Sequence, residues 1–226
     1  MALTNEQKLE HHSKFAAATN AGQPVGIALE GGALNAVVTK NLVSKVLTTA
    51  TGGYGARGIA VATGSASSNV EISNNIVYGV NGSNYSAFSN SSSIGIGLGV
   101  SNSTITDATG GVRVYYNTVR LSGDYTYAAN CITAALYVGS GATTLDIRNN
   151  IFVNTLNNTN ASGTASKNYA AYSAAANTAF STVNNNNYSA SGTQGVLSYL
   201  GSDATTLAAL QTAFGGNANS QVATPS

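Results

Sequence analysis

Val70-Glu71-Ile72-Ser73-Asn74-Asn75-Ile76 decides the fold, because its pattern occurs five times along the chain. Apolar and polar residues alternate, and an asparagine ends the run. The other four copies, the last of them degraded, are residues 36–42, 112–118, 145–151 and 181–187. The aligned asparagines, at steps of 34, 42, 33 and 36 residues, are Asn41, Asn75, Asn117, Asn150 and Asn186. An internal period of this size is typical of solenoids, propellers and other repeat arrays.

Each copy has the pattern of a half-buried strand, because a period of two places every second side chain on one face. The asparagine suits a turn, since Asn tolerates the left-handed conformation and bonds its own backbone. A second short apolar strand precedes each copy, at residues 25–29, 58–61, 94–98, 132–136 and 169–172. If equivalent positions stack, the asparagines form a ladder of side-chain amides. The pattern predicts a parallel β-helix of about five two-strand repeats.

The repeats resemble the right-handed parallel β-helix proteins, the pectate-lyase-like solenoids. The likeness is greatest at residues 52–59 and 68–76, and residues 187–189, 205–214 and 217–220 are similar to the closing segment of some secreted bacterial β-helix proteins. It covers roughly residues 24–226. The resemblance implies an all-β, right-handed parallel β-helix with short terminal capping helices, located outside the cell or at its surface. This scaffold hosts lyases, hydrolases, adhesins and phage spikes, so the resemblance names no activity.

The two ends depart from the repeat. We expect residues 1–23 to form an N-terminal helical cap or arm, residues 24–200 the β-helix, and residues 201–226 a C-terminal capping helix and tail. Helical spacing of apolar residues predicts the first helix over 4–18 and places the second after 203–206, closed by glycines. Such helices would cover sheet edges that otherwise template pairing with another chain.

The composition narrows the possible partners. The chain has 27 asparagines and 25 glycines, and 8% of its residues are charged, where about 25% is usual. A net charge of +1 provides no basic surface for nucleic acid or an anionic membrane. No run of 18 apolar residues occurs, so we expect no membrane span. Residues 1–8 lack the pattern of a signal peptide, so the expectation of export depends on the resemblance.

The acidic residues are few and scattered. They are Glu6, Glu10, Glu30, Glu71, Asp107, Asp124, Asp146 and Asp203. The resemblance implies that a lyase would gather carboxylates around calcium, and a glycosidase would need two or three clustered acids. The sequence shows no such cluster, so we predict no catalytic residue, metal or cofactor.

One charged column does align. Glu71, Arg113 and Asp146 occupy the same position of three successive copies, which predicts a ladder of alternating charge at ~4.8 Å spacing. This ladder is interpreted either as cross-strand ion pairs or as a substrate-binding stripe with Arg148 beside it.

Tyrosines are the second candidate for function. Tyr115 and Tyr116 are expected in one strand, and further tyrosines at 125, 127, 137, 169 and 172 fall in or near the following coils. Outward rings beside asparagines and threonines would form a shallow platform for sugars; alternatively, the rings pack against loops. The candidate ligand-binding residues are Arg113, Tyr115, Tyr116 and Arg148.

Three functions fit these observations. The favoured one is a non-catalytic extracellular solenoid acting as a structural, adhesive or self-assembling surface module. Its expected partners are copies of itself, in an oligomer or an end-to-end or lateral fibre, or a neutral polysaccharide. The alternative is a polysaccharide-active β-helix enzyme, a lyase or hydrolase, or a glycan-binding module. An ice-binding solenoid ranks last, because it requires a regular threonine array and the threonines are scattered.

Overall fold

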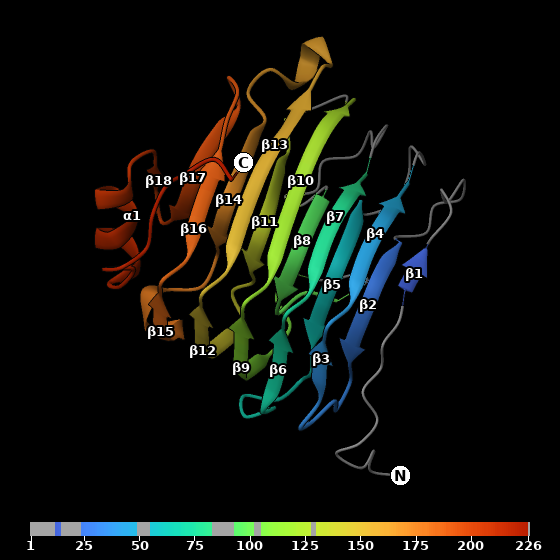
Figure 1. Cartoon of the computed structure of the whole chain (residues 1–226), viewed down its shortest axis with the longest axis vertical. Coiled ribbons are helices and arrows are strands. Elements are labelled where there is room, and N and C mark those ends of the chain that lie inside the picture. Colours follow the sequence, from blue (N-terminus) through green and yellow to red (C-terminus); the bar gives the residue numbers. More distant parts are fainter. Residues whose placement is uncertain are drawn as a thin grey trace.

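The computed structural model describes residues 12–14, 24–48, 55–82, 93–101, 105–127 and 130–225. In this part of the chain, strands of successive repeats stack side by side into three sheets (Figure 1). Neighbouring strands run parallel, apart from the last pair of one sheet. The sheets are the walls of one parallel β-helix, so the all-β solenoid predicted from the repeats is confirmed.

The elements are as follows. The six-stranded sheet contains β1 (His12–Lys14), β4 (Leu42–Leu47), β7 (Ile76–Asn81), β10 (Thr118–Tyr125), β13 (Ile151–Asn158) and β16 (Asn187–Ala190). The seven-stranded sheet contains β18 (Asp203–Ala204), β17 (Gly195–Leu200), β14 (Lys167–Ser173), β11 (Ile132–Val138), β8 (Ser93–Leu98), β5 (Ala56–Ala62) and β2 (Val25–Glu30). The five-stranded sheet contains β15 (Phe180–Asn184), β12 (Ala142–Arg148), β9 (Thr109–Tyr115), β6 (Val70–Ser73) and β3 (Val37–Thr39). The helices are η1 (Ala161–Gly163), η2 (Asn177–Ala179) and α1 (Leu207–Phe214).

Each repeat has three strands, and the prediction of two was wrong. The missed strand follows the asparagine directly: β6 ends at Ser73 and β7 begins at Ile76. Alternation resumes at once, since Val77 and Val80 are buried in the core. The glycine between them, Gly79, has a φ of 62° and interrupts the regular period in this strand.

The corner between the five-stranded and six-stranded sheets also differs from expectation in one detail. The residue in the left-handed conformation precedes the aligned asparagine. Its φ lies between 56° and 60° in every copy, at Lys40, Asn74, Tyr116, Asn149 and Asn185. The aligned asparagine is therefore not the residue that makes the turn. Its side chain instead forms hydrogen bonds with the neighbouring coils.

The aligned asparagines form a hydrogen-bonded ladder of buried amides. The Oδ1 atom of Asn75 accepts from the backbone N–H of Asn41 at 3.0 Å and from its Nδ2 at 2.9 Å. Asn117 receives the same two bonds from Asn75, Asn150 from Asn117, and Asn186 from Asn150, all at 2.9–3.0 Å. The predicted ladder is confirmed over all five asparagines.

The ladder also ties each corner to the core. The Nδ2 atom of Asn117 donates to the carbonyl of Ile72, one coil earlier, at 2.9 Å. Ile72 belongs to a column of inward residues that continues through Val114 and Ile147. These side chains are buried, and burying each contributes roughly 1.5–3 kcal/mol to folding.

The C-terminal tail closes the ladder. Ser220 lies one further step of 34 residues beyond Asn186, and its Oγ accepts the backbone N–H of Asn186 at 2.9 Å. The next residue, Gln221, pairs in parallel with Asn187. The Ser220 hydroxyl donates in turn to Asn217 Oδ1, which also accepts from the Tyr188 hydroxyl. The tail thus takes the place of a sixth coil.

A helix completes this end of the molecule (Figure 1). Thr206 caps α1, since its side chain accepts from the N–H of Ala209, and Gly215 ends the helix at a φ of 65°. Leu210 and Phe214 are buried, and the Phe214 ring meets Phe180 edge-on at 5.1 Å. The predicted C-terminal capping helix is confirmed.

The predicted N-terminal helix lies mostly outside the described residues. Within it, His12–Lys14 are described, and they form strand β1, which pairs in parallel with β4. Among the described residues, no helix is both long and apolar enough to cross a membrane.

Replacing Asn117 with alanine should lower the free energy of unfolding by about 3 kcal/mol, because buried groups on two neighbouring coils lose their partners at ~1–3 kcal/mol each. Urea denaturation measures the change. Asn157→Ala is the control, since Asn157 is exposed and, within the part of the chain that the structure describes, its side chain bonds only Asp124. The control should change stability by less than about 0.5 kcal/mol. Equal losses in both variants would contradict a structural role for the ladder.

Candidate functional site: the polar face

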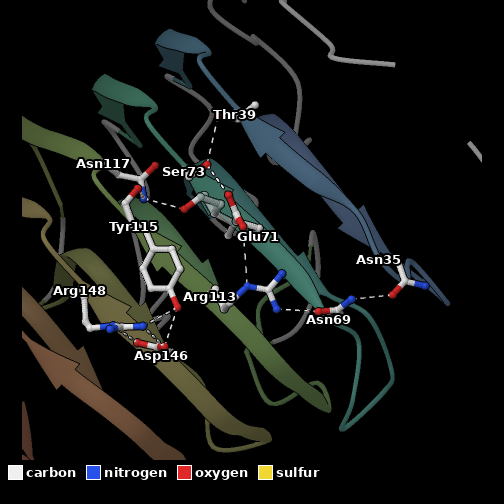
Figure 2. A network of polar contacts seen from close by, with 11 residues as sticks. Asn35, Thr39, Asn69, Glu71, Ser73, Arg113, Tyr115, Asn117, Asp146 and Arg148 are labelled. Atoms are coloured by element: carbon white, nitrogen blue, oxygen red, sulfur yellow. Dashed lines mark hydrogen bonds and ion pairs between the residues drawn. The ribbon is translucent and has the colours of Figure 1, made fainter. Parts of the chain in front are cut away.

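The outward side chains of the five-stranded sheet form two columns that are polar (Figure 2), apart from the exposed Val37, which is the register partner of Glu71. Strand register places Glu71, Arg113 and Asp146 side by side in one column. The second column contains Thr39, Ser73, Tyr115 and Arg148. Together with Asn35 and Asn69 at the adjoining corner, we call these residues the polar face.

One half of the polar face is centred on Arg113. Its Nε lies 3.7 Å from the Glu71 carboxylate, and its Nη1 donates to Asn69 Oδ1 at 2.6 Å. Asn69 donates onward to Asn35 Oδ1 at 2.8 Å. The Ser73 hydroxyl lies 2.8 Å from Glu71 Oε1; since a carboxylate only accepts, the serine donates. The chain of bonds holds Arg113 and Glu71 in fixed positions.

The other half is a triad of Tyr115, Asp146 and Arg148. The guanidinium of Arg148 binds Asp146 with two bonds of 2.6 Å, from Nε and Nη2. The Tyr115 hydroxyl donates to Asp146 Oδ2 at 2.6 Å and accepts from Arg148 Nη2 at 3.0 Å. Arg148 also lies over the Tyr115 ring, 5.0 Å from its centroid. A forked ion pair of this kind fixes the relative orientation of the two side chains and also pairs their opposite charges.

The register of the predicted charge ladder is confirmed, but its ion pairing is only partly as expected. Glu71 pairs with Arg113 across the strands, whereas Asp146 pairs with Arg148 in its own strand. Residues two apart share one face of a strand, so both arginines are neighbours of Asp146. The planar fork of Arg148 satisfies both carboxylate oxygens.

Tyr115 and Tyr116 do not lie in one strand, and that prediction was wrong. Tyr115 ends β9 and belongs to the triad. Tyr116 is the left-handed corner residue, with a φ of 57°, and 61% of it is exposed. Tyr116 therefore lies at the corner next to the polar face, one residue after Tyr115.

Sequence reasoning did not include Asn35, Thr39, Asn69 and Ser73 in the site. The two asparagines could have been found from the sequence, because they are 34 residues apart, the same step as between Asn41 and Asn75. Both have positive φ, 55° and 52°, so they occupy equivalent corners. Ser73 lies in the quoted copy itself, in register with Tyr115.

The other predicted tyrosines are elsewhere. Tyr125 and Tyr127 are buried in the core. Tyr137, Tyr172 and Tyr199 stack outside the seven-stranded sheet, with ring centroids 5.0 and 4.7 Å apart. Burial raises the pKa of Tyr125, Tyr137, Tyr169 and Tyr188 above the ordinary value of 10. Tyr125 and Tyr127 thus pack in the core and not against loops, and the partly buried Tyr172 and Tyr199 pack against the cluster of Tyr137 and Tyr169.

The polar face has the parts for binding and few of those for acid–base catalysis. Within the described ranges, no three histidine, cysteine or acidic side chains gather closely enough to hold a metal ion. Burial, followed by the bond to Asp146, raises the pKa of Tyr115. Its hydroxyl therefore stays a neutral donor over the physiological range.

Comparison with known proteins adds no family to this description: no family model, no curated protein and no solved structure matches the chain. The parallel β-helix is shown by its own geometry. The resemblance to the pectate-lyase-like family remains an expectation.

Stability should fall as the pH rises above about 10. Unfolded phenols ionise near pH 10, whereas the folded protein keeps the buried ones protonated. Above that pH the folded state holds more protons than the unfolded state, so raising the pH favours unfolding. Melting temperature and phenolate absorbance, measured together, check this. Ionisation of all 12 tyrosines near pH 10 with no loss of structure would contradict it.

Proposed function

We propose that this protein is a non-catalytic, extracellular surface-contact module whose polar face binds a neutral polysaccharide. The supporting observation is the pair of arginines. Arg113 Nη2 and Arg148 Nη1 have no protein partner among the described residues. Arg113 Nη1 and the Nε and Nη2 atoms of Arg148 donate hydrogen bonds within the face, and Arg113 Nε lies 3.7 Å from the Glu71 carboxylate. Their side chains are 36% and 42% exposed.

Fixed donors of this kind suit sugar hydroxyls. The two arginines are in adjacent strands, ~4.8 Å apart along the axis. The network holds them in place before a ligand arrives, which reduces the ordering cost of binding. A sugar oxygen can accept from each free nitrogen, while the Ser73 hydroxyl, buried between Thr39 and Glu71, helps to hold the face in place.

The balance of charge favours a neutral ligand. Each arginine is paired with one carboxylate, Glu71 or Asp146. The polar face therefore has no excess positive charge with which to select an anionic polymer. The exposed ring of Tyr116, at the corner next to the polar face, offers an apolar face for stacking on a sugar ring.

The carboxylates are poorly arranged for glycoside cleavage. Glu71 and Asp146 lie two strands apart, so their backbones are about 10 Å from each other. Both carboxylates are also bound by guanidinium groups on an open sheet surface. This supports binding without turnover.

The proposed extracellular location is based on the resemblance to secreted solenoids and on the low share of charged residues, 8%. Asn, Ser and Thr side chains supply most of its polarity. Such a surface matches the hydroxyl-rich polymers of a cell wall or matrix.

Co-sedimentation with insoluble neutral glycans should test the polar face. Wild-type protein should bind at least one member of a panel of cellulose, chitin, mannan and xylan. The double variant Arg113→Gln/Arg148→Gln should bind at least ~10-fold more weakly, because two charged donors are lost. Lys45→Gln is the control, since Lys45 is exposed on another sheet. Unchanged binding by the double variant would contradict the assignment.

The same glycans should yield no new reducing ends or unsaturated products on prolonged incubation. Tyr116→Ala should weaken adhesion without altering this result. Release of products by wild-type protein would overturn the non-catalytic proposal and favour the enzyme alternative.

A further inference from the structure

The seven-stranded sheet carries a stack of three tyrosine rings on its outer side. Strand register places Tyr137, Tyr172 and Tyr199 at equivalent positions of β11, β14 and β17. The centroids of the Tyr172 and Tyr199 rings are 4.7 Å apart, with 9° between the ring planes. Tyr137 lies 5.0 Å from Tyr172 at an angle of 18°. The rings therefore repeat at about the ~4.8 Å spacing of the strands.

Two of these rings are accessible from solvent. Tyr137 is 1% exposed, whereas Tyr172 and Tyr199 are partly exposed. Tyr172 and Tyr199 are also the closest and most nearly parallel pair of rings among the described residues. A small diffusible molecule can thus reach two phenols that are already in contact.

Neighbouring side chains hold this pair in place. The Tyr169 ring meets both rings edge-on, with its centroid 5.2 Å from that of Tyr172 and 6.1 Å from that of Tyr199. The Tyr169 hydroxyl donates to Asp203 Oδ1 at 2.9 Å. Asp203, the register partner of Tyr199 in β18, also binds Lys167. The two rings are therefore kept together by contacts on several sides.

We propose that Tyr172 and Tyr199 form an oxidative crosslinking site, at which a one-electron oxidant such as a peroxidase joins the two rings as dityrosine. The proposal is independent of glycan binding, because it uses a different sheet. It concerns one chain and needs no second copy.

The reaction requires the two phenols and the oxidant alone. Each phenol gives one electron to the oxidant and its hydroxyl proton to water, which leaves two phenoxyl radicals. Their unpaired electrons lie partly on the carbons ortho to oxygen. One such carbon of each ring forms the new C–C bond, and the hydrogens on these two carbons then transfer as protons to the oxygens. Altogether two electrons and two protons leave the protein.

Contact between the rings decides which tyrosines couple. Two rings held together react in an effectively intramolecular step, whereas separated radicals must first meet. Tyr78 and Tyr116 are more exposed, at 41% and 61%. Within the described part of the chain, neither of them contacts another ring. Exposure alone therefore does not predict a crosslink at these two residues.

The crosslink would fasten the last coils of the solenoid. It joins β14 to β17 and closes a loop of the chain that contains β15 and β16. A covalent bridge restricts the unfolded chain, as a disulfide does, and so stabilises the fold. The chain has one cysteine, which leaves it without an internal disulfide, and dityrosine would supply an internal bridge of another kind.

Light-driven oxidation with a ruthenium–bipyridyl complex and persulfate tests the proposal. Dilute wild-type protein should gain dityrosine fluorescence while it remains a single chain on denaturing gels. Tyr172→Phe and Tyr199→Phe keep a ring at each position and should each lose most of this fluorescence. Tyr78→Phe is the control, because Tyr78 is more exposed than either ring of the pair and its loss should leave the yield unchanged.

Digestion with trypsin identifies the joined rings. No lysine or arginine follows Lys167, so Tyr172 and Tyr199 both fall in the fragment 168–226. Their crosslink should lower the mass of this one fragment by two hydrogen atoms. A bond between Tyr172 and Tyr137 would instead join it to the fragment 121–148.

The crosslinked protein should also melt at a higher temperature than the untreated protein. Wild-type protein without dityrosine, an undiminished yield in either Tyr172→Phe or Tyr199→Phe, or a crosslink found only in other fragments would each overturn the proposal. An unchanged melting temperature would overturn the stabilising role of the bond.

Discussion

A single asparagine oxygen accepting two hydrogen bonds from the preceding coil determines the arrangement of the whole solenoid. A buried amide must find partners for its oxygen and its nitrogen, or its burial costs several kcal/mol. Both are satisfied at Asn117 when the coils stand in one register. A slip of one residue would also turn every inward side chain of a strand toward solvent. The ladder and the core therefore select the same alignment.

That alignment creates the surfaces as well as the interior. Stacking in register brings together residues more than 30 positions apart, such as Tyr115 and Arg148. Two of the sheets then carry their own chemistry: paired charges on one wall and stacked tyrosines on another. A function based on contact needs no pocket, because a periodic wall already repeats its groups at a fixed distance. The proposed glycan surface and the proposed crosslinking site share this origin and use separate walls.

The repeat was sufficient to predict the stacked strands, the amide ladder and the C-terminal helix, because each depends on residue spacing. The third strand was missed because it follows the corner asparagine with no intervening loop, and in β7 its period is also interrupted by the bend at Gly79. The place of Tyr116 could not be predicted, since its corner needs a left-handed residue and most copies use asparagine or lysine there. Asp146 pairs with Arg148 and not with Arg113 because of the side-chain rotamers of these residues. An alignment of the repeats contains no information about rotamers.

The ladder has a direction, and this bears on how the chain is made. Each backbone donor at a corner finds its acceptor in the following coil, roughly one repeat later in the sequence. During synthesis, a coil emerging from the ribosome would therefore wait for the next before its corner closed. The last acceptor, on Ser220, lies near the end of the chain. The coils would thus assemble one after another from the N-terminus. If synthesis stopped early, every complete coil except the last would already have its corner hydrogen bonds.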